Sequence, residues 1–157
     1  MRDLHELNIN EMGRPVSNPS PTEANFIELE TALGVSLPDD YKVLLRFANG
    51  GHPELNSFVP EGAALESRWS VDIFYHLSSD KTGPTSIWRT LREYTPVLKP
   101  HHLPIGRDEG GNQIVIDLDD SPPSVKLAIH DDDFREISVA PSVDRFLNLL
   151  ATDPDMI

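Results

Sequence analysis

The sequence predicts a single α+β domain in which a mainly antiparallel sheet is flanked by N-terminal and C-terminal helices. Apolar residues recur at helical spacing in two segments near the N-terminus and again near the C-terminus. From Leu103 the apolar period changes to two, as in half-buried antiparallel strands. The length of 157 residues suits one domain, which we expect over residues 20–152, with an N-terminal arm at 1–19 and a tail at 153–157.

The first helix is expected over residues 21–33. Ser20 is the predicted N-cap, Pro21 suits the first helical position, and Glu23 follows three residues after the cap. Gly34 is the expected C-terminal stop.

A second helix is expected from Asp39 to Ala48. The residue before Pro38 is pushed toward extended backbone, so the first helix cannot continue into the second. Asp39 and Asp40 place negative charge at the N-terminus, where the helix dipole favours it. The apolar positions at i, i+3, i+4 and i+7 are Tyr41, Leu44, Leu45 and Ala48, and Asn49-Gly50-Gly51 ends the helix.

The centre of the chain is predicted as mainly strands. Residues 52–68 are expected to be loop, and Trp69–Leu77 has the β-branched and aromatic content of a strand. A short amphipathic helix follows and ends near Tyr94. Further strands are expected at 114–118 and 125–129, joined by the turn Asp119–Pro123, before a closing helix that carries Val143, Phe146, Leu147 and Leu150.

The composition is strongly acidic, with 13 Lys and Arg against 26 Asp and Glu and a formal net charge of −13. This charge argues against direct binding to nucleic acid, because phosphate neutralisation needs clustered basic residues. The absence of Cys excludes disulfides and Cys-ligated zinc and fits a reducing compartment. No apolar run resembles a signal peptide or a membrane span, so we expect a cytoplasmic protein without membrane contact.

The sequence predicts no catalytic residue, cofactor or metal ligand set. It lacks a nucleophile elbow, His101-His102 is expected in a surface turn, and His52 and His76 are isolated. The loop from Gly106 to Asn112 is not followed by Gly-Lys-Ser/Thr or by a helix, so phosphate binding is not favoured. We expect a tight connection in which Gly110 and Gly111 take positive φ.

Acidic residues cluster in two later segments. If the strands pair across the Pro122-Pro123 turn, Asp117, Asp119 and Asp120 could gather with Asp131–Asp133 at one end of the sheet. A hard cation such as Ca²⁺ or Mg²⁺ would accept such carboxylates, but the EF-hand spacing is absent and solvated turns are the favoured interpretation.

Three segments together carry a family resemblance. The first contains Leu37, Pro38, Tyr41, Asn49, Gly50 and Gly51. The second contains Gly106, Gly110, Gly111 and Asn112, with Asp117 closing the next strand. The third is Val125–Asp131, which is followed by the C-terminal helix. In order and spacing these segments resemble the SMI1/KNR4 family, within the wider SUKH group, over about residues 20–150, although the turn at 119–123 and the loop at 52–68 depart from its pattern.

The resemblance implies a compact α+β fold and no catalytic triad. Bacterial members are commonly immunity proteins that bind and neutralise toxins, often nucleases, and fungal members resemble signalling scaffolds in cell-wall regulation. The matched residues are of structural type: Leu37-Pro38 sets a helix entry, Tyr41 packs, and the Asn and Gly residues turn the chain. Such a family leaves its surface free to vary between partners.

The favoured hypothesis is therefore a non-enzymatic immunity protein that binds a basic toxin domain, such as a nuclease, through an acidic surface. Residues 108–136 hold nine acidic residues against Lys126 and Arg135. The candidate partner-binding residues are Asp108, Glu109, Asp117, Asp119, Asp120, Asp131, Asp132 and Asp133. Two alternatives stay open, an intracellular scaffold and a small-molecule binder or hydrolase that uses His52, His76 and His130; the oligomeric state is not specified.

Overall fold

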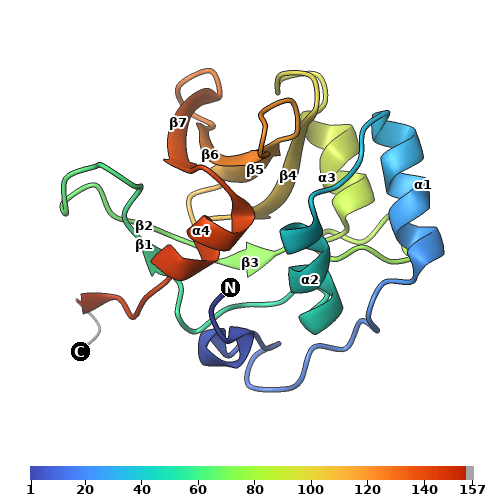
Figure 1. Ribbon diagram of the computed structural model, residues 1–157, viewed down its shortest axis with the longest axis horizontal. Helices are drawn as coiled ribbons and strands as arrows, with labels where there is room; N and C mark the ends of the chain where they lie inside the picture. Colours follow the sequence, from blue (N-terminus) through green and yellow to red (C-terminus); the bar gives the residue numbers. More distant parts are fainter. Residues whose placement is uncertain (155–157) are drawn as a thin grey trace.

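The computed structural model describes residues 1–154 and confirms the α+β class. Its helices are the 3₁₀ helix η1 (Leu4–Leu7), α1 (Glu23–Leu33), α2 (Asp39–Phe47), α3 (Ile87–Tyr94) and α4 (Val143–Leu149). Its strands are β1 (Ser57–Phe58), β2 (Trp69–Ser70), β3 (Ile73–Phe74), β4 (His102–Arg107), β5 (Gln113–Asp117), β6 (Ser124–Ile129) and β7 (Arg135–Ala140). Strands β3 to β7 form one antiparallel sheet in chain order, and β1 pairs with β2 in a separate two-stranded sheet (Figure 1).

Helix α1 begins at a different cap from the one expected. Thr22 is the N-cap: its hydroxyl accepts from the Asn25 amide at 3.2 Å, and the Asn25 side chain accepts from the Thr22 amide at 2.9 Å. This reciprocal pair satisfies two amides that Ser20 cannot reach, because the Ser20 hydroxyl instead donates to the Arg46 carbonyl. The prediction of Ser20 as the cap was therefore wrong, whereas Gly34 ends the helix in the left-handed conformation, as expected.

The single strand predicted at Trp69–Leu77 was also wrong. It is divided into β2, which pairs with β1, and β3, which pairs with β4. Between the two strands the Val71 amide still bonds to the Asn56 carbonyl, whereas the Asp72 amide bonds to the Arg107 carbonyl. The chain therefore passes from one sheet to the other within a few residues. The edge strand β7 was not anticipated, and β1 lies within the segment expected to be loop.

The core fills one face of the five-stranded sheet. Leu103, Ile116 and Val125 lie opposite one another on successive strands and are fully buried. Apolar side chains that face one another across strands stabilise such a sheet, and side chains of α2 and α4 complete the same cluster. Leu4 and Leu7, from the segment expected to be an N-terminal arm, are buried in it as well. The last three residues of the predicted tail, 155–157, lie outside the described residues.

The other face of the sheet is polar at one end. His102, Asp117 and Ser124 lie opposite one another one position away from the apolar row, so their side chains point to the opposite face. Lys126 is two residues from Ser124 on the same strand and shares this face. A cluster of charged groups therefore lies on the sheet itself.

Candidate protein-interaction face

Asp108 organises the loop between β4 and β5. Its carboxylate accepts hydrogen bonds from the backbone amide and from the side-chain amide of Asn112, both at 2.8 Å. Gly111 takes a φ of 90°, which favours glycine, but Gly110 does not lie in the left-handed region, so that part of the turn prediction was wrong. Asp108 is only 7% exposed and serves the loop, so it is not available to a partner.

Asn112 joins this loop to the turn between β6 and β7. Its Oδ1 accepts a hydrogen bond from the His130 amide at 3.0 Å, and Gly111 lies against the His130 ring. The two loops are therefore held together at their bases. Their exposed carboxylates are those of Glu109, Asp131, Asp132 and Asp133, which we call the acidic rim.

The turn that carries most of the acidic rim has an unusual backbone. Asp133 and Phe134 take φ angles of 52° and 56°, a region that is rarely populated by a bulky residue such as phenylalanine. The Phe134 ring packs edge-on against Tyr94 of α3, with ring centroids 5.7 Å apart, and the Phe134 amide bonds to the Ile129 carbonyl. Asp132 also pairs with Arg135 at 2.6 Å. These contacts support this conformation of the turn.

Two shallow hollows flank the β4–β5 loop, each of about 340 Å³. One lies toward α3 and is lined by Asp72, Glu93 and Arg107, and the other lies toward Arg68 and Trp69. Asp108 and Glu109 line both hollows, so the loop forms a ridge between them. In the first hollow Arg107 pairs with Asp72 at 3.8 Å, which leaves an excess of negative charge around the ridge.

The remaining predicted acids do not join the acidic rim. Asp119 and Asp120 lie in the β5–β6 turn, and β6 separates that turn from Asp131–Asp133. The expectation that all these carboxylates gather at one sheet end was therefore wrong, because a full strand lies between the two turns. Asp119 is hydrogen-bonded to His101 at 2.8 Å, and Asp120 accepts from Ser124.

Asp117 belongs to a buried charge network. Lys126 donates to it at 2.8 Å, and the residue is 7% exposed. Burial opposes ionisation, but the hydrogen bonds from Lys126 and from the Asp119 amide hold the pKa of Asp117 below its usual value. Asp117 therefore neutralises an internal partner and does not face a ligand.

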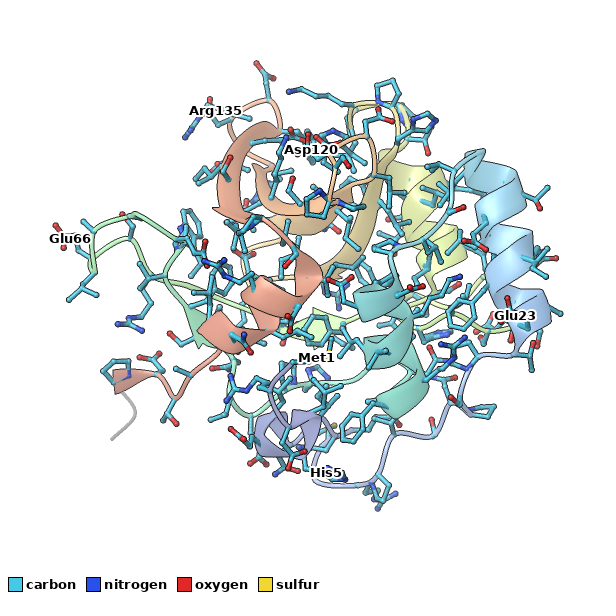
Figure 2. The ribbon with its side chains drawn as sticks, viewed as in Figure 1. Met1, His5, Glu23, Glu66, Asp120 and Arg135 are labelled. Atoms are coloured by element: carbon cyan, nitrogen blue, oxygen red, sulfur yellow. The ribbon has the colours of Figure 1, made fainter. Side chains whose placement is uncertain are left out.

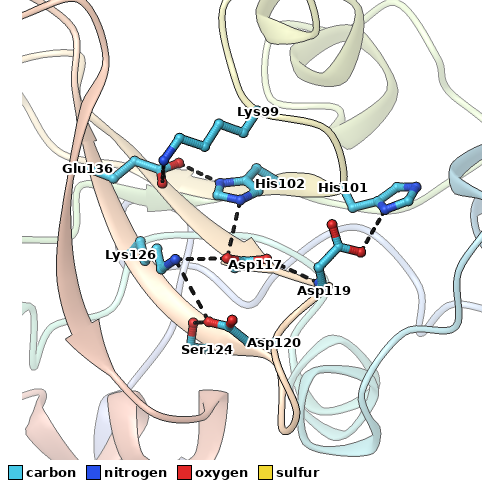
Figure 3. A network of polar contacts seen from close by, with 9 residues as sticks. All are labelled: Lys99, His101, His102, Asp117, Asp119, Asp120, Ser124, Lys126 and Glu136. Atoms are coloured by element: carbon cyan, nitrogen blue, oxygen red, sulfur yellow. Dashed lines mark hydrogen bonds and ion pairs between the residues drawn. The ribbon is translucent and has the colours of Figure 1, made fainter.

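His102 belongs to the same network as Asp117 (Figure 3). It was expected in a surface turn, but it is the first residue of β4 and is 7% exposed. Its Nδ1 lies 2.5 Å from Glu136 and its Nε2 lies 3.3 Å from Asp117. The period of two that begins at Leu103 extends back to His102, which was the signal in the sequence that could have placed it on the sheet.

The other histidines have separate partners. His52 Nδ1 lies 2.6 Å from the Asp72 carbonyl, His76 Nδ1 lies 3.0 Å from the Ser78 hydroxyl, and His130 is exposed. Burial lowers the pKa of His76 and favours its neutral form. Within residues 1–154, no group of three or more His, Asp or Glu side chains is arranged to hold a metal ion.

The residues that carry the family resemblance in the sequence have structural roles in the fold. The Asn49 side chain donates to the carbonyls of Pro19 and Leu77 and accepts from the Leu77 amide at 2.8 Å, while Gly50 and Gly51 both take positive φ. A Cβ on Gly106 would lie 2.7 Å from the Ile73 carbonyl, so only glycine allows β3 to pair closely with β4 there. Leu37 and Tyr41 are buried in the core, and Pro38 is the N-cap residue of α2.

The fold and this face define a small α+β domain with an exposed acidic rim on two joined loops. The sequence model of the SMI1 / KNR4 family (SUKH-1) matches residues 20–149, so the chain belongs to this family. Comparison with curated proteins gives no match.

Membership in this family supports a protein-binding domain of immunity type, with a protein such as a toxin as partner. Members of the family are generally non-enzymatic. In the part of the chain that the structure describes, no helix is both long and apolar enough to cross a bilayer.

Proposed function

We propose that this protein is a cytoplasmic, non-enzymatic immunity protein that binds and neutralises a basic toxin domain, a nuclease, through the acidic rim. The observation that carries the proposal is that three of the four rim carboxylates are exposed and, among the described residues, unpaired. Within residues 1–154, Glu109, Asp131 and Asp133 are exposed, have no ion-pair partner and lie on the two loops that Asn112 joins. These three charges are therefore available to a partner.

The contacts that hold the β6–β7 turn support the same proposal. A loop that is ordered before association loses little conformational entropy when it binds, so more of the interaction energy appears as affinity. Phe134 against Tyr94 and Asn112 against His130 provide this order. The hollows beside the β4–β5 loop give room for side chains of the partner.

Electrostatics explains why the partner should be a nuclease. A nuclease cleft must be positive to hold phosphates, so an acidic surface can occupy the same cleft and exclude the nucleic acid. The net charge of −13 adds long-range attraction that raises the association rate.

The test uses the toxin domain of any large secreted protein encoded beside the gene for this chain. The purified domain is assayed for nuclease activity with increasing amounts of this protein, and we expect inhibition that is complete near one equivalent. The triple change of Asp131, Asp132 and Asp133 to Asn should weaken the inhibition. No inhibition of a nuclease by the wild-type chain, together with capture of housekeeping proteins only, would contradict the proposal and support the scaffold role.

A further inference from the structure

One edge of the five-stranded sheet is formed by β7. The strand order runs from β3 to β7, so β7 has a neighbouring strand on one side only (Figure 1). The opposite edge, at β3, is covered, because the Phe74 amide and carbonyl both bond to Gly51. An unpaired edge presents N–H and C=O groups that can pair with another chain. The free edge of this sheet is therefore β7.

The register of the sheet shows the direction in which the main chain of each strand points. The Leu118 amide bonds to the His101 carbonyl on β4, so the main chain of Asp117, one residue earlier, points toward β6. Asp117 lies opposite Ser124, whose main chain therefore points back toward β5. Because this direction alternates along a strand, the main chain of Leu127, three residues further on, points toward β7.

Two residues of β7 therefore direct their main chain away from the sheet. Ile137 lies opposite Leu127, so its N–H and C=O groups point toward β6. By the same alternation, the N–H and C=O groups of Glu136 and Ser138 point outward, and Ser138 is exposed to solvent. Since β7 is the last strand of the sheet, these groups have no strand to pair with.

A hollow of about 420 Å³ lies beside the same edge. Its lining includes Ser138 and Val139 of β7, Lys126 of β6, and Glu61 and Asp120. The Glu61 amide bonds to the Val139 carbonyl at 2.9 Å, so the segment before β2 closes this end of the edge. A strand that pairs with β7 places alternate side chains on each face of the sheet, and the hollow gives room for one of them.

The surroundings of this edge are negatively charged. The acidic rim comes directly before β7 in the chain, and the Asp120 side chain at the hollow is 48% exposed. The basic side chains beside the edge are already paired, Arg135 with Asp132 at 2.6 Å and Lys126 with Asp117 at 2.8 Å. A segment that binds here therefore needs positive side chains. A second copy of this chain is repelled, because its net charge is −13.

We propose that an extended, basic segment of the partner protein adds as a strand to β7, through main-chain hydrogen bonds at Glu136 and Ser138 and with one side chain in the adjoining hollow. This inference rests on the proposed function for the identity of the partner and adds the way in which the partner is held. The acidic rim attracts the basic side chains of the segment, and main-chain pairing fixes its position.

The first test needs no toxin and uses an acetylated, amidated peptide of three Lys-Val repeats. Amide resonances of the isotope-labelled protein are followed by NMR while the peptide is added to millimolar concentration. We expect a saturable downfield shift of the Glu136 and Ser138 amides, because each gains a hydrogen bond, whereas the Ile137 amide changes less.

The control for this test is the same peptide methylated at every backbone nitrogen. It keeps the charge of the first peptide but has no main-chain N–H with which to pair along a strand. Equal shifts with the two peptides would show that charge alone drives binding and would overturn strand addition. The absence of any shift with the unmodified peptide would overturn it as well.

A matched pair of variants tests the same edge in the complex with the toxin domain. Ser138→Pro removes an N–H that points away from the sheet, so the free protein loses no hydrogen bond between strands. Ser138→Ala removes only the hydroxyl and keeps this N–H. We expect the proline variant to inhibit the nuclease about tenfold more weakly, the equivalent of one lost hydrogen bond, and the alanine variant to match the wild type.

The outcomes separate strand addition from the proposed function. Equal inhibition by Ser138→Pro and Ser138→Ala would overturn strand addition and leave the proposed function intact. A nuclease that the wild type does not inhibit would contradict the proposed function, and the peptide experiment would still decide whether β7 accepts a strand. The peptide experiment also decides the case in which Ser138→Pro does not fold.

Discussion

Replacing Asn112 with alanine tests whether this side chain holds the two loops of the acidic rim together. The change removes the hydrogen bond from Nδ2 to Asp108 at 2.8 Å and the hydrogen bond from the His130 amide to Oδ1 at 3.0 Å. The first involves a buried carboxylate and is worth about 1.5–3 kcal/mol, and the second is worth about 0.5–1.5 kcal/mol. We therefore expect Asn112→Ala to lower the free energy of unfolding by about 2–4.5 kcal/mol.

The assay is urea unfolding followed by tryptophan fluorescence, with the midpoint and the slope fitted separately. Asn148→Ala, on the exposed side of α4, is the matched control and should change stability by less than about 0.5 kcal/mol. The slope should stay constant in both variants, because the surface exposed on unfolding does not change. If Asn112→Ala were as stable as the control, the hydrogen bonds between the two loops would contribute nothing measurable to the free energy of unfolding. The argument that they hold the acidic rim in place would then fail.

Three further predictions concern the framework and its charges. Asn49→Ala removes three side-chain hydrogen bonds, two of them buried, and should cost about 3 kcal/mol in the same urea assay; a cost below about 1 kcal/mol would contradict this. Gly111→Ala should cost about 1 kcal/mol because its φ is 90°, whereas Gly110→Ala should be nearly neutral; equal costs would show that the loop conformation is wrong. Because its pKa is lowered in the folded state, Asp117 stabilises the protein above its unfolded pKa and loses this effect as the pH falls. Asp117→Asn should therefore lose less stability than the wild type between about pH 5 and about pH 2, and an identical acid profile would refute the role of the Lys126 pair.

Elements fixed by local patterns could be predicted from the sequence. Tyr41, Leu44 and Leu45 repeat at helical spacing and are all buried on α2, and Val143, Phe146 and Leu147 do the same on α4. The alternation after Leu103 predicted β5 and β6 for the same reason. Such signals depend only on residues a few positions apart.

Features that depend on distant contacts could not be predicted. Val71 and Asp72 bond to different sheets, and nothing in the run from Trp69 to Leu77 marks that change of partner. The partnership of His102 with Glu136 depends on how far the sheet curls, which the period of the strands does not specify.

The candidate site was predicted in part. The sequence indicated the acidic segment and the glycine loop, and the structure joins Glu109 to Asp131–Asp133 through Asn112. It could not show that Asp108 and Asp117 face inward, since an aspartate in a loop or at a strand end has the same sequence signature whether it binds a neighbour or stays free. Only the distances to Asn112 and Lys126 distinguish the two cases.

The most direct test of the central claim is the association rate of this protein with its toxin domain at low ionic strength. The rim variant Asp131→Asn/Asp133→Asn is compared with Glu23→Gln/Glu28→Gln on α1, which has the same net charge; Figures 1 and 2 show α1 and Arg135, beside the rim, on opposite sides of the view. We predict that the rim variant associates about tenfold more slowly and with a weaker salt dependence, while the α1 variant stays close to the wild type. Equal rates for the two variants would show that only the overall charge matters and would contradict the assignment of the acidic rim as the binding surface.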